Sequence, residues 1–148
     1  PYAITTSNDR TARVWDLATG THHTTLTGHT STVNGVAVAQ IDGRPHAITT
    51  SNDKTARVWD LTTGTHHTTL TGHTDWVTAV AVAQIDGRPH AITTGDDKTA
   101  RVWDLYSVRC IAKLSLPLAG DAITAHKDCI VLGMANEVIV LQRNAQGS

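Results

Sequence analysis

Short apolar runs alternate with polar turn residues along most of this chain. The runs are rich in β-branched and small residues, and turn residues separate them roughly every eight to twelve positions. This pattern is typical of short antiparallel strands, whereas the apolar period of a helix does not occur. In the most regular part we expect four strands joined by turns, at residues 33–39, 47–50, 55–61 and 66–70.

The strand pattern recurs at a fixed interval. Trp15, Trp59 and Trp103 follow one another 44 residues apart, and an aspartate follows each of them. Residues 40–46 recur in the same way as residues 84–90. Repeats of this length are units that bury their apolar faces against their neighbours. We therefore expect the four strands of one repeat to make one small sheet in a stack of similar sheets.

Radial stacking covers both apolar faces of such sheets, as in a β-propeller. The first expected strand, residues 33–39, consists mostly of small residues, which suits a position where sheets converge on a central channel. The predicted fold class is therefore an all-β propeller of four-stranded antiparallel blades, with about three and a half blades in this chain. Other chains, or sequence outside this one, are expected to complete the ring.

The recurring Gly-His pair, the tight turn that contains an aspartate and the closing Trp-Asp together resemble the WD-repeat family of β-propellers, in the bacterial form with nearly identical repeats. The resemblance covers residues 1–116. It implies a partial propeller over residues 1–143 with three, four, four and three strands, and a tail at 144–148. The implied units are a truncated blade at 1–28, complete blades at 29–72 and 73–116, and a degenerate C-terminal blade at 117–143.

In the WD-repeat family a histidine, a strand serine or threonine, the turn aspartate and the tryptophan form a hydrogen-bonded tetrad. The resemblance places the tetrad of the first complete blade at His29, Ser51, Asp53 and Trp59. The second complete blade has His73, Asp97 and Trp103, and the truncated blade keeps Ser7, Asp9 and Trp15. Gly95 stands where the first complete blade has Ser51. We therefore expect water or a neighbouring threonine to restore the hydrogen-bonded connection between Trp103 and His73, and we expect this blade to be the looser one.

Ser51, His29 and Asp53 are also the ingredients of a nucleophilic triad. They recur with the repeat, as structural residues do, and the rest of the chain offers no constellation that stands outside the repeat. The prediction is therefore that the chain is not an enzyme. The alternative, a propeller hydrolase, requires turnover that depends on His29.

No metal ion or cofactor is expected. The pairs His22-His23 and His66-His67 invite a metal interpretation, but adjacent residues of a strand point to opposite faces. Cys110 and Cys129 are the only two cysteines, and their spacing is not that of zinc ligands. Few cysteines fit a reducing interior, so the expected localisation is cytoplasmic.

Charge and hydropathy exclude two classes of partner. The net charge of −1 provides no positive field for a phosphate backbone, which makes nucleic acid an unexpected ligand. The apolar runs are too short and too interrupted to span a bilayer, so no membrane association is expected.

The informative positions are those at which the two nearly identical repeats differ. We expect these positions to cluster on one rim of the ring. The resemblance implies that this rim binds partners, as it usually does in WD-repeat proteins. The positions are Thr32, Asn34, Asn52, Asp75, Trp76, Thr78 and Asp96. Trp76 has two interpretations: an interface anchor, or a cover for the tetrad beneath it.

The sequence therefore predicts a non-catalytic scaffold that binds other proteins through this rim. Two alternatives stay open: a regulatory or sensor domain of a larger signalling NTPase or kinase, and a recently amplified repeat array that assembles into a ring. The expected partners are unidentified proteins, together with self-association or pairing with an N-terminal half.

Overall fold

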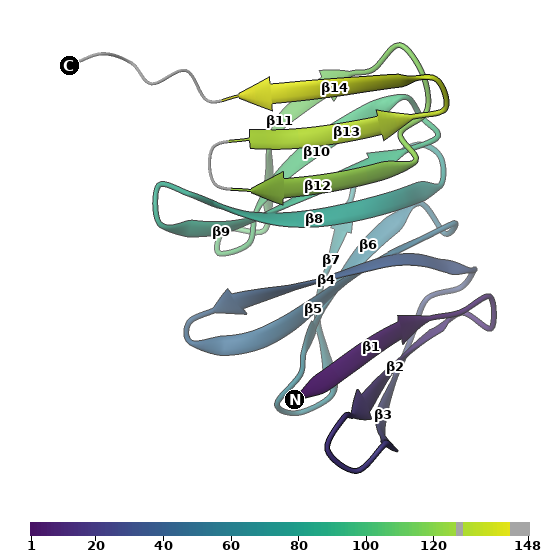
Figure 1. The fold of residues 1–148 in the computed structure, drawn as a ribbon, viewed down its shortest axis with the longest axis vertical. Coiled ribbons are helices and arrows are strands. Elements are labelled where there is room, and N and C mark those ends of the chain that lie inside the picture. The colour runs from purple at the N-terminus through teal and green to yellow at the C-terminus, as the bar shows by residue number, and fades with distance from the viewer. Residues whose placement is uncertain (127–128, 143–148) are drawn as a thin grey trace.

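The computed structural model describes residues 1–126 and 129–142, which form fourteen β-strands and no helix (Figure 1). Arg143 of the expected last blade and the expected tail at 144–148 lie outside these residues. Nothing in the described ranges is a helix long and apolar enough to cross a membrane. The strands are β1 (Tyr2–Thr6), β2 (Thr11–Asp16), β3 (Thr21–Thr27), β4 (Val33–Ile41), β5 (Arg44–Ser51), β6 (Thr55–Asp60), β7 (Thr65–Thr71), β8 (Val77–Ile85), β9 (Arg88–Gly95), β10 (Thr99–Asp104), β11 (Arg109–Ser115), β12 (Ala122–His126), β13 (Cys129–Met134) and β14 (Glu137–Gln142).

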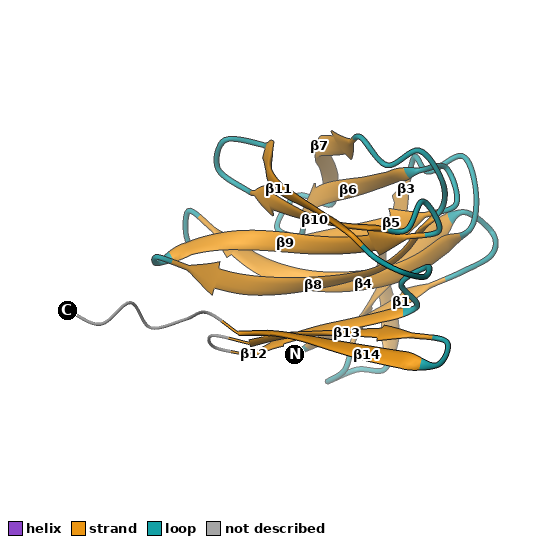
Figure 2. Cartoon of the chain, turned by 90° about the horizontal axis from the view of Figure 1, so that it is seen from above, coloured by secondary structure: helices purple, strands orange, loops and turns teal. Residues whose placement is uncertain are grey.

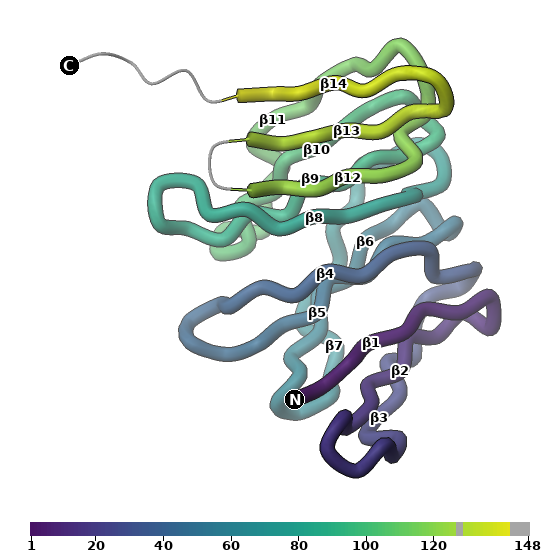
Figure 3. The backbone as a smooth tube through the Cα atoms, in the orientation of Figure 1, coloured from purple at the N-terminus to yellow at the C-terminus, as the bar shows by residue number. Residues whose placement is uncertain are grey.

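These strands form four antiparallel sheets of three, four, four and three strands, as the repeat predicts. In order they are β1-β2-β3, β4-β5-β6-β7, β8-β9-β10-β11 and β12-β13-β14. The sheets follow one another from the N-terminus to the C-terminus, and each sheet is a meander of hairpins (Figure 3). Within the part of the chain that the structure describes, the sheets do not close into a ring.

The first strands of successive sheets are neighbours. Strand β4 contacts β8, and β8 contacts β12. Figure 2 shows β4 and β8 side by side, with the outer strands β7 and β11 displaced to one side. This is the arrangement expected of strands that line the inside of a propeller.

Tight turns hold the hairpins in register. Asp42 and Gly43 connect β4 to β5 with φ angles of 50° and 72°, and Asp86 and Gly87 do the same for β8 and β9 with 51° and 74°. Two consecutive positive φ angles define the turn whose twist suits a two-residue hairpin. The turn fixes which residues of β4 face each neighbouring sheet.

The apolar core lies between the sheets. Strand β4 has two apolar faces: Ala39 and Ile41 pack toward the third sheet, whereas Val36 packs toward the first. This alternation follows from the two-residue period of a strand. The third interface is built around Leu132 and Met134 of β13. Each sheet therefore buries apolar side chains against its neighbours.

Candidate functional site

Four side chains of the second sheet form a continuous hydrogen-bonded chain. The indole Nε1 of Trp59 donates to Thr49 Oγ1 at 2.8 Å, and Thr49 Oγ1 lies 2.8 Å from Nε2 of His29. Nδ1 of His29 is 2.7 Å from a carboxylate oxygen of Asp53. The chain links the inner loop, strands β5 and β6, and the turn between them.

The hydroxyl in this chain belongs to Thr49, so the placement of Ser51 in the tetrad is wrong. Ala47 pairs with Trp59 and Thr49 with Arg57, which puts Thr49 diagonally beside Trp59 on one face. Ser51 is two residues, or about 7 Å, farther along the strand. Its hydroxyl donates to the carbonyl of Ser31 at 3.1 Å and accepts from the amide of Asp53 at 3.0 Å. Ser51 therefore holds the loop and the turn together.

The third sheet repeats the chain with Thr93 in the central position. Trp103 donates to Thr93 at 2.9 Å, Thr93 lies 2.8 Å from His73, and His73 lies 2.9 Å from Asp97. The expected repair around Gly95 is not needed, because Gly95 replaces a residue outside the relay. The expectation that this blade is the looser one rested on that mistake.

The first sheet retains half of the arrangement. Trp15 donates to Thr5 Oγ1 at 2.9 Å, and the amide of Asp9 donates to Ser7 at 3.2 Å. The Asp9 carboxylate pairs with the guanidinium of Arg13 at 2.9 Å. Thr5, Thr49 and Thr93 recur at the 44-residue interval without change, but so do the adjacent Thr6, Thr50 and Thr94, so the repeats alone do not identify the central hydroxyl.

Only a neutral histidine satisfies every group of the relay. If Nδ1 of His29 donates to Asp53, Nε2 can accept the Thr49 hydroxyl proton, and Thr49 can accept from Trp59. Burial lowers the pKa of His29, and its hydrogen bond to Asp53 raises it by less. Burial also raises the pKa of Asp53, but hydrogen bonds from Thr55, His29 and the Thr30 amide outweigh it and hold that pKa below its usual value.

This geometry leaves no nucleophile at the tetrad. The hydroxyl of Ser51 donates to a carbonyl rather than to His29, and both Ser51 and Thr49 have 0% exposure. A triad requires an exposed serine that donates to the imidazole. Residues 1–126 and 129–142 also contain no group of three histidine, cysteine or acidic side chains that could hold a metal ion.

The structure brings the rim positions of the second sheet together. Asn34 donates to the side-chain oxygen of Asn52 at 2.7 Å, and the amide of Asn52 donates to the carbonyl of Thr32 at 3.0 Å. Asn34 also donates to the carbonyl of Val77 in the next sheet at 2.8 Å. These polar side chains therefore connect the loop, the turn and the neighbouring sheet.

On the third sheet, the rim carries a large apolar group. The amide of Asp96 donates to the carbonyl of Trp76 at 2.9 Å, and Thr78 donates to the carbonyls of Thr94 and Gly120. The Trp76 side chain is 49% exposed. Trp76 therefore stands on the rim, while Thr78 ties the third sheet to the fourth.

The second sheet provides a comparison for the interpretation of Trp76 as a cover. Thr32 occupies the place of Trp76 in the second sheet, yet His29 and His73 are each 7% exposed. A threonine thus leaves the tetrad histidine as well covered as a tryptophan does. Trp76 is not required as a cover.

Carboxylates gather around Asp96, whose amide donates to the carbonyl of Trp76. Burial raises the pKa of Asp96, and the negative charges of Asp75, Asp121 and Asp97 raise it further. In the second sheet the places of Asp75 and Asp96 are taken by the neutral Ser31 and Asn52. The acidic character of this rim is therefore specific to the third sheet. The name Trp76 rim is used below for Asp75, Trp76, Asp96 and Asp121.

Two comparisons with known proteins bear on this arrangement. The family described as WD domain, G-beta repeat, matches residues 20–60 and 64–104, which is more than half of the chain. A stretch of 36 residues is 64% identical to the pre-mRNA-splicing factor PRP46 of Saccharomyces cerevisiae. That stretch is 24% of this chain and only 8% of the splicing factor, so the similarity concerns the repeat rather than the whole protein.

Proposed function

The chain belongs to the WD-repeat family, and on that premise we propose that it is a non-catalytic scaffold that binds a protein partner through the Trp76 rim. WD-repeat domains generally mediate contacts between proteins. Five of the seven rim residues named from the sequence fall into two groups. The side chains of Asn34, Asn52 and Thr78 make hydrogen bonds to other strands or turns, whereas the carboxylate of Asp75 accepts from the adjacent amide of Trp76 and the Trp76 side chain is exposed.

The exposure of Trp76 is the observation that carries the proposal. A tryptophan that is 49% exposed is costly to keep in water, and the second sheet shows that threonine serves the fold at the same place. Exposed tryptophans at the centre of a patch are frequent anchors of protein interfaces. The indole therefore serves as the apolar centre of the contact.

The charge of the rim indicates which partner fits. Asp75 and Asp121 lie close enough to Asp96 for their negative charges to raise its pKa. A partner with lysine or arginine side chains would neutralise these carboxylates, and a cation can also stack on the indole face. We therefore propose a basic protein segment as the bound element.

The non-catalytic part of the proposal is supported by the tetrad. Its threonine, histidine and aspartate make bonds to one another, and each is buried or at a structural turn. Removing any one of these side chains leaves a buried polar group without a hydrogen-bond partner, which lowers the free energy of unfolding. This stabilising role explains the presence of these residues without catalysis.

A reducing, cytoplasmic setting completes the proposal. Cys110 and Cys129 are both free thiols, and Cys110 is exposed on β11. Exposed free thiols are uncommon in oxidising compartments. A disulfide on Cys110 in protein taken from its native source would contradict this setting.

The binding role of the Trp76 rim can be tested by substituting its residues with those at the equivalent positions of the second sheet. Trp76→Thr, Asp75→Ser and Asp96→Asn each place in the third sheet the residue of the equivalent position in the second. Labelled lysine- and arginine-rich peptides, and glutamate-rich peptides of equal length, are titrated with the full chain, and anisotropy is measured. We expect the basic peptides to bind, and Trp76→Thr to weaken binding about ten-fold or more.

Two further measurements make the result specific. Asp75→Ser and Asp96→Asn should weaken the basic peptides less and flatten the salt dependence of binding. Thr32→Ser, at the equivalent place of the second sheet, should leave binding unchanged. Equal binding of acidic and basic peptides, or unchanged binding by a folded Trp76→Thr variant, would rule the proposal out.

A further inference from the structure

The Trp76 rim extends across the boundary between the third and fourth sheets. Trp76 is the last residue before β8, and Asp121 is the last residue before β12. Strands β8 and β12 contact each other, and both Trp76 and Asp121 are exposed. Asp121 therefore has, on the fourth sheet, the place that Trp76 has on the third.

The two sheets are joined close to these residues. The hydroxyl of Thr78, the second residue of β8, donates to the carbonyl of Gly120, which immediately precedes Asp121. Gly120 is buried, and a Cβ at its position would lie 2.6 Å from the Cβ of Thr94. Because a side chain does not fit there, glycine lets the backbone of the loop before β12 pack directly against the third sheet.

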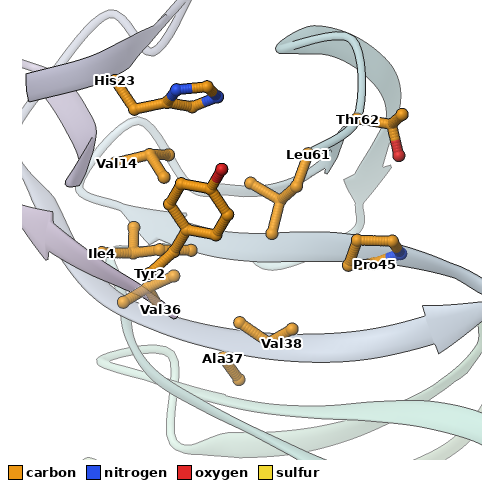
Figure 4. A pocket seen from close by; sticks show the side chains of 10 residues that line it. All are labelled: Tyr2, Ile4, Val14, His23, Val36, Ala37, Val38, Pro45, Leu61 and Thr62. Atoms are coloured by element: carbon orange, nitrogen blue, oxygen red, sulfur yellow. The ribbon is translucent and has the colours of Figure 1, made fainter. Parts of the chain in front are cut away.

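Such close contact is not found at every sheet boundary. An open groove of about 730 Å³ lies between the first and second sheets, and Tyr2, Val38 and Leu61 are among the side chains around it (Figure 4). Side chains on either side of an open groove are free to shift relative to each other. At the Trp76 rim, the hydrogen bond from Thr78 to Gly120 instead fixes the position of Asp121 relative to Trp76.

Asp121 adds its negative charge to those of the third sheet. After burial, the charges of Asp75, Asp121 and Asp97 raise the pKa of Asp96. The boundary between the second and third sheets differs, because Asn52 there stands in the place of Asp96 and Trp76 in the place of Asp121. Acidic side chains therefore lie on both sides of the boundary at the Trp76 rim, but not at the preceding one.

We propose that the Trp76 rim is a bipartite site for a segment with two separate cationic side chains, and that Thr78 positions its two halves. One half is Asp75 with Trp76, where a cation stacks on the indole, and the other half is Asp121. Packed sheets lie about 10 Å apart and an extended segment advances about 3.3 Å per residue, so cationic residues three positions apart fit both halves. This inference rests on the proposed function, because it takes a basic segment as the partner.

The spacing can be tested with two peptides of equal length and composition. One carries two arginines three positions apart, the other carries them side by side, and the remaining residues are serine and glycine. Each is titrated into the full ¹⁵N-labelled chain, and the indole signal of Trp76 is followed by NMR. We expect the spaced peptide to bind about two- to five-fold more tightly, the range of one exposed ion pair, and to shift the amide signal of Asp121 as well.

Three variants test the role of the second half. Asp121→Asn and Thr78→Ala should each make the two peptides bind equally, whereas Thr78→Ser keeps the hydroxyl and should keep the preference for the spaced peptide. A general loss of stability would weaken both peptides alike, so the ratio of the two affinities separates positioning from folding. Asp42→Asn, in the exposed turn after β4, removes an equal charge elsewhere and should leave the ratio unchanged.

The outcomes separate this inference from the proposed function. If neither peptide shifts the Trp76 signal, both are overturned. If both peptides bind the unsubstituted chain equally, only the bipartite site is overturned. A preference for the spaced peptide that persists in Asp121→Asn or in a folded Thr78→Ala variant would also overturn it, because the second half or its positioning would then lie elsewhere.

Discussion

Gly95 and Trp76 meet across the rim of the third sheet, where the carbonyl oxygen of Trp76 lies 2.6 Å from the position that a Cβ on Gly95 would occupy. In the second sheet Ser51 takes the place of Gly95, and its hydroxyl donates to the carbonyl of Ser31 in the equivalent loop. Glycine thus lets the Trp76 loop approach the turn closely. The exposed Trp76 and the glycine at position 95 are therefore in direct contact through the backbone of the loop.

Gly95→Ala is expected to destabilise the chain by about 1–3 kcal/mol, because the added methyl must displace backbone. Urea unfolding followed by circular dichroism measures this change. Ser51→Gly in the second sheet is the control; it should cost about 0.5–1.5 kcal/mol for each hydrogen bond it removes. A neutral or stabilising Gly95→Ala would mean that the loop does not rest on the glycine.

The assignment of Thr49 to the relay has its own test. Thr49→Val keeps the side-chain shape but leaves the Trp59 indole and Nε2 of His29 without a partner, at about 1–3 kcal/mol for each buried group. Ser51→Ala should cost less, because its bonds lie at the turn. The midpoints of urea unfolding show which of the two variants is less stable. The tetrad assignment is wrong if Ser51→Ala proves the more damaging substitution.

The neutral tetrad histidines predict a loss of stability in mild acid. Burial lowers the pKa of His29 and His73 below the ordinary value of 6.5, so the folded chain binds fewer protons than the unfolded chain below that pH. Stability is therefore complete above 6.5 and declines as the pH falls from there toward the folded-state pKa. Urea unfolding at a series of pH values between about 5 and 8 measures the slope.

His29→Gln serves as the control for this pH dependence, since it should reduce the slope while His73 retains its share. A second decline is expected at lower pH. Hydrogen bonds hold the pKa of Asp53 and Asp97 below 3.8, so their contribution is present above that value and disappears as the pH falls through the folded-state pKa. A free energy of unfolding that increases as the pH falls below 6.5 would contradict the neutral state of His29 and His73.

Local pattern and the repeat interval were enough to predict the sheets. The strands expected at 55–61 and 66–70 correspond to β6 and β7, because their apolar alternation and turn residues are local signals. The first hairpin is longer than expected. Pro45 falls between the expected strands at 33–39 and 47–50, but it lies within β5 opposite Gln40, because Asp42 and Gly43 alone complete the reversal.

The site was harder to predict because its contacts depend on strand register. Thr49 and Ser51 have the same polarity and lie on the same side of the strand, and only the pairing of Ala47 with Trp59 shows which hydroxyl the indole reaches. The roles of Asn34 and Thr78 depend on the distance between sheets. Asn34 bonds to the carbonyl of Val77 in the next sheet and Thr78 to that of Gly120 in the loop before the next sheet, contacts that no pattern within one repeat reveals.

The outer face of the fourth sheet predicts association of the chain. Val138 and Val140 of β14 are 68% and 55% exposed, whereas Ile139 and Leu141 between and beside them pack against the third sheet. Two exposed valines on an edge strand attract further strands and apolar surfaces. Light scattering should therefore show an apparent mass that rises with concentration, and replacing both valines with lysine should abolish that rise. Leu118→Lys, at an exposed position outside β14, should leave it in place, and a mass that stays constant for the unsubstituted chain would show that this face does not associate.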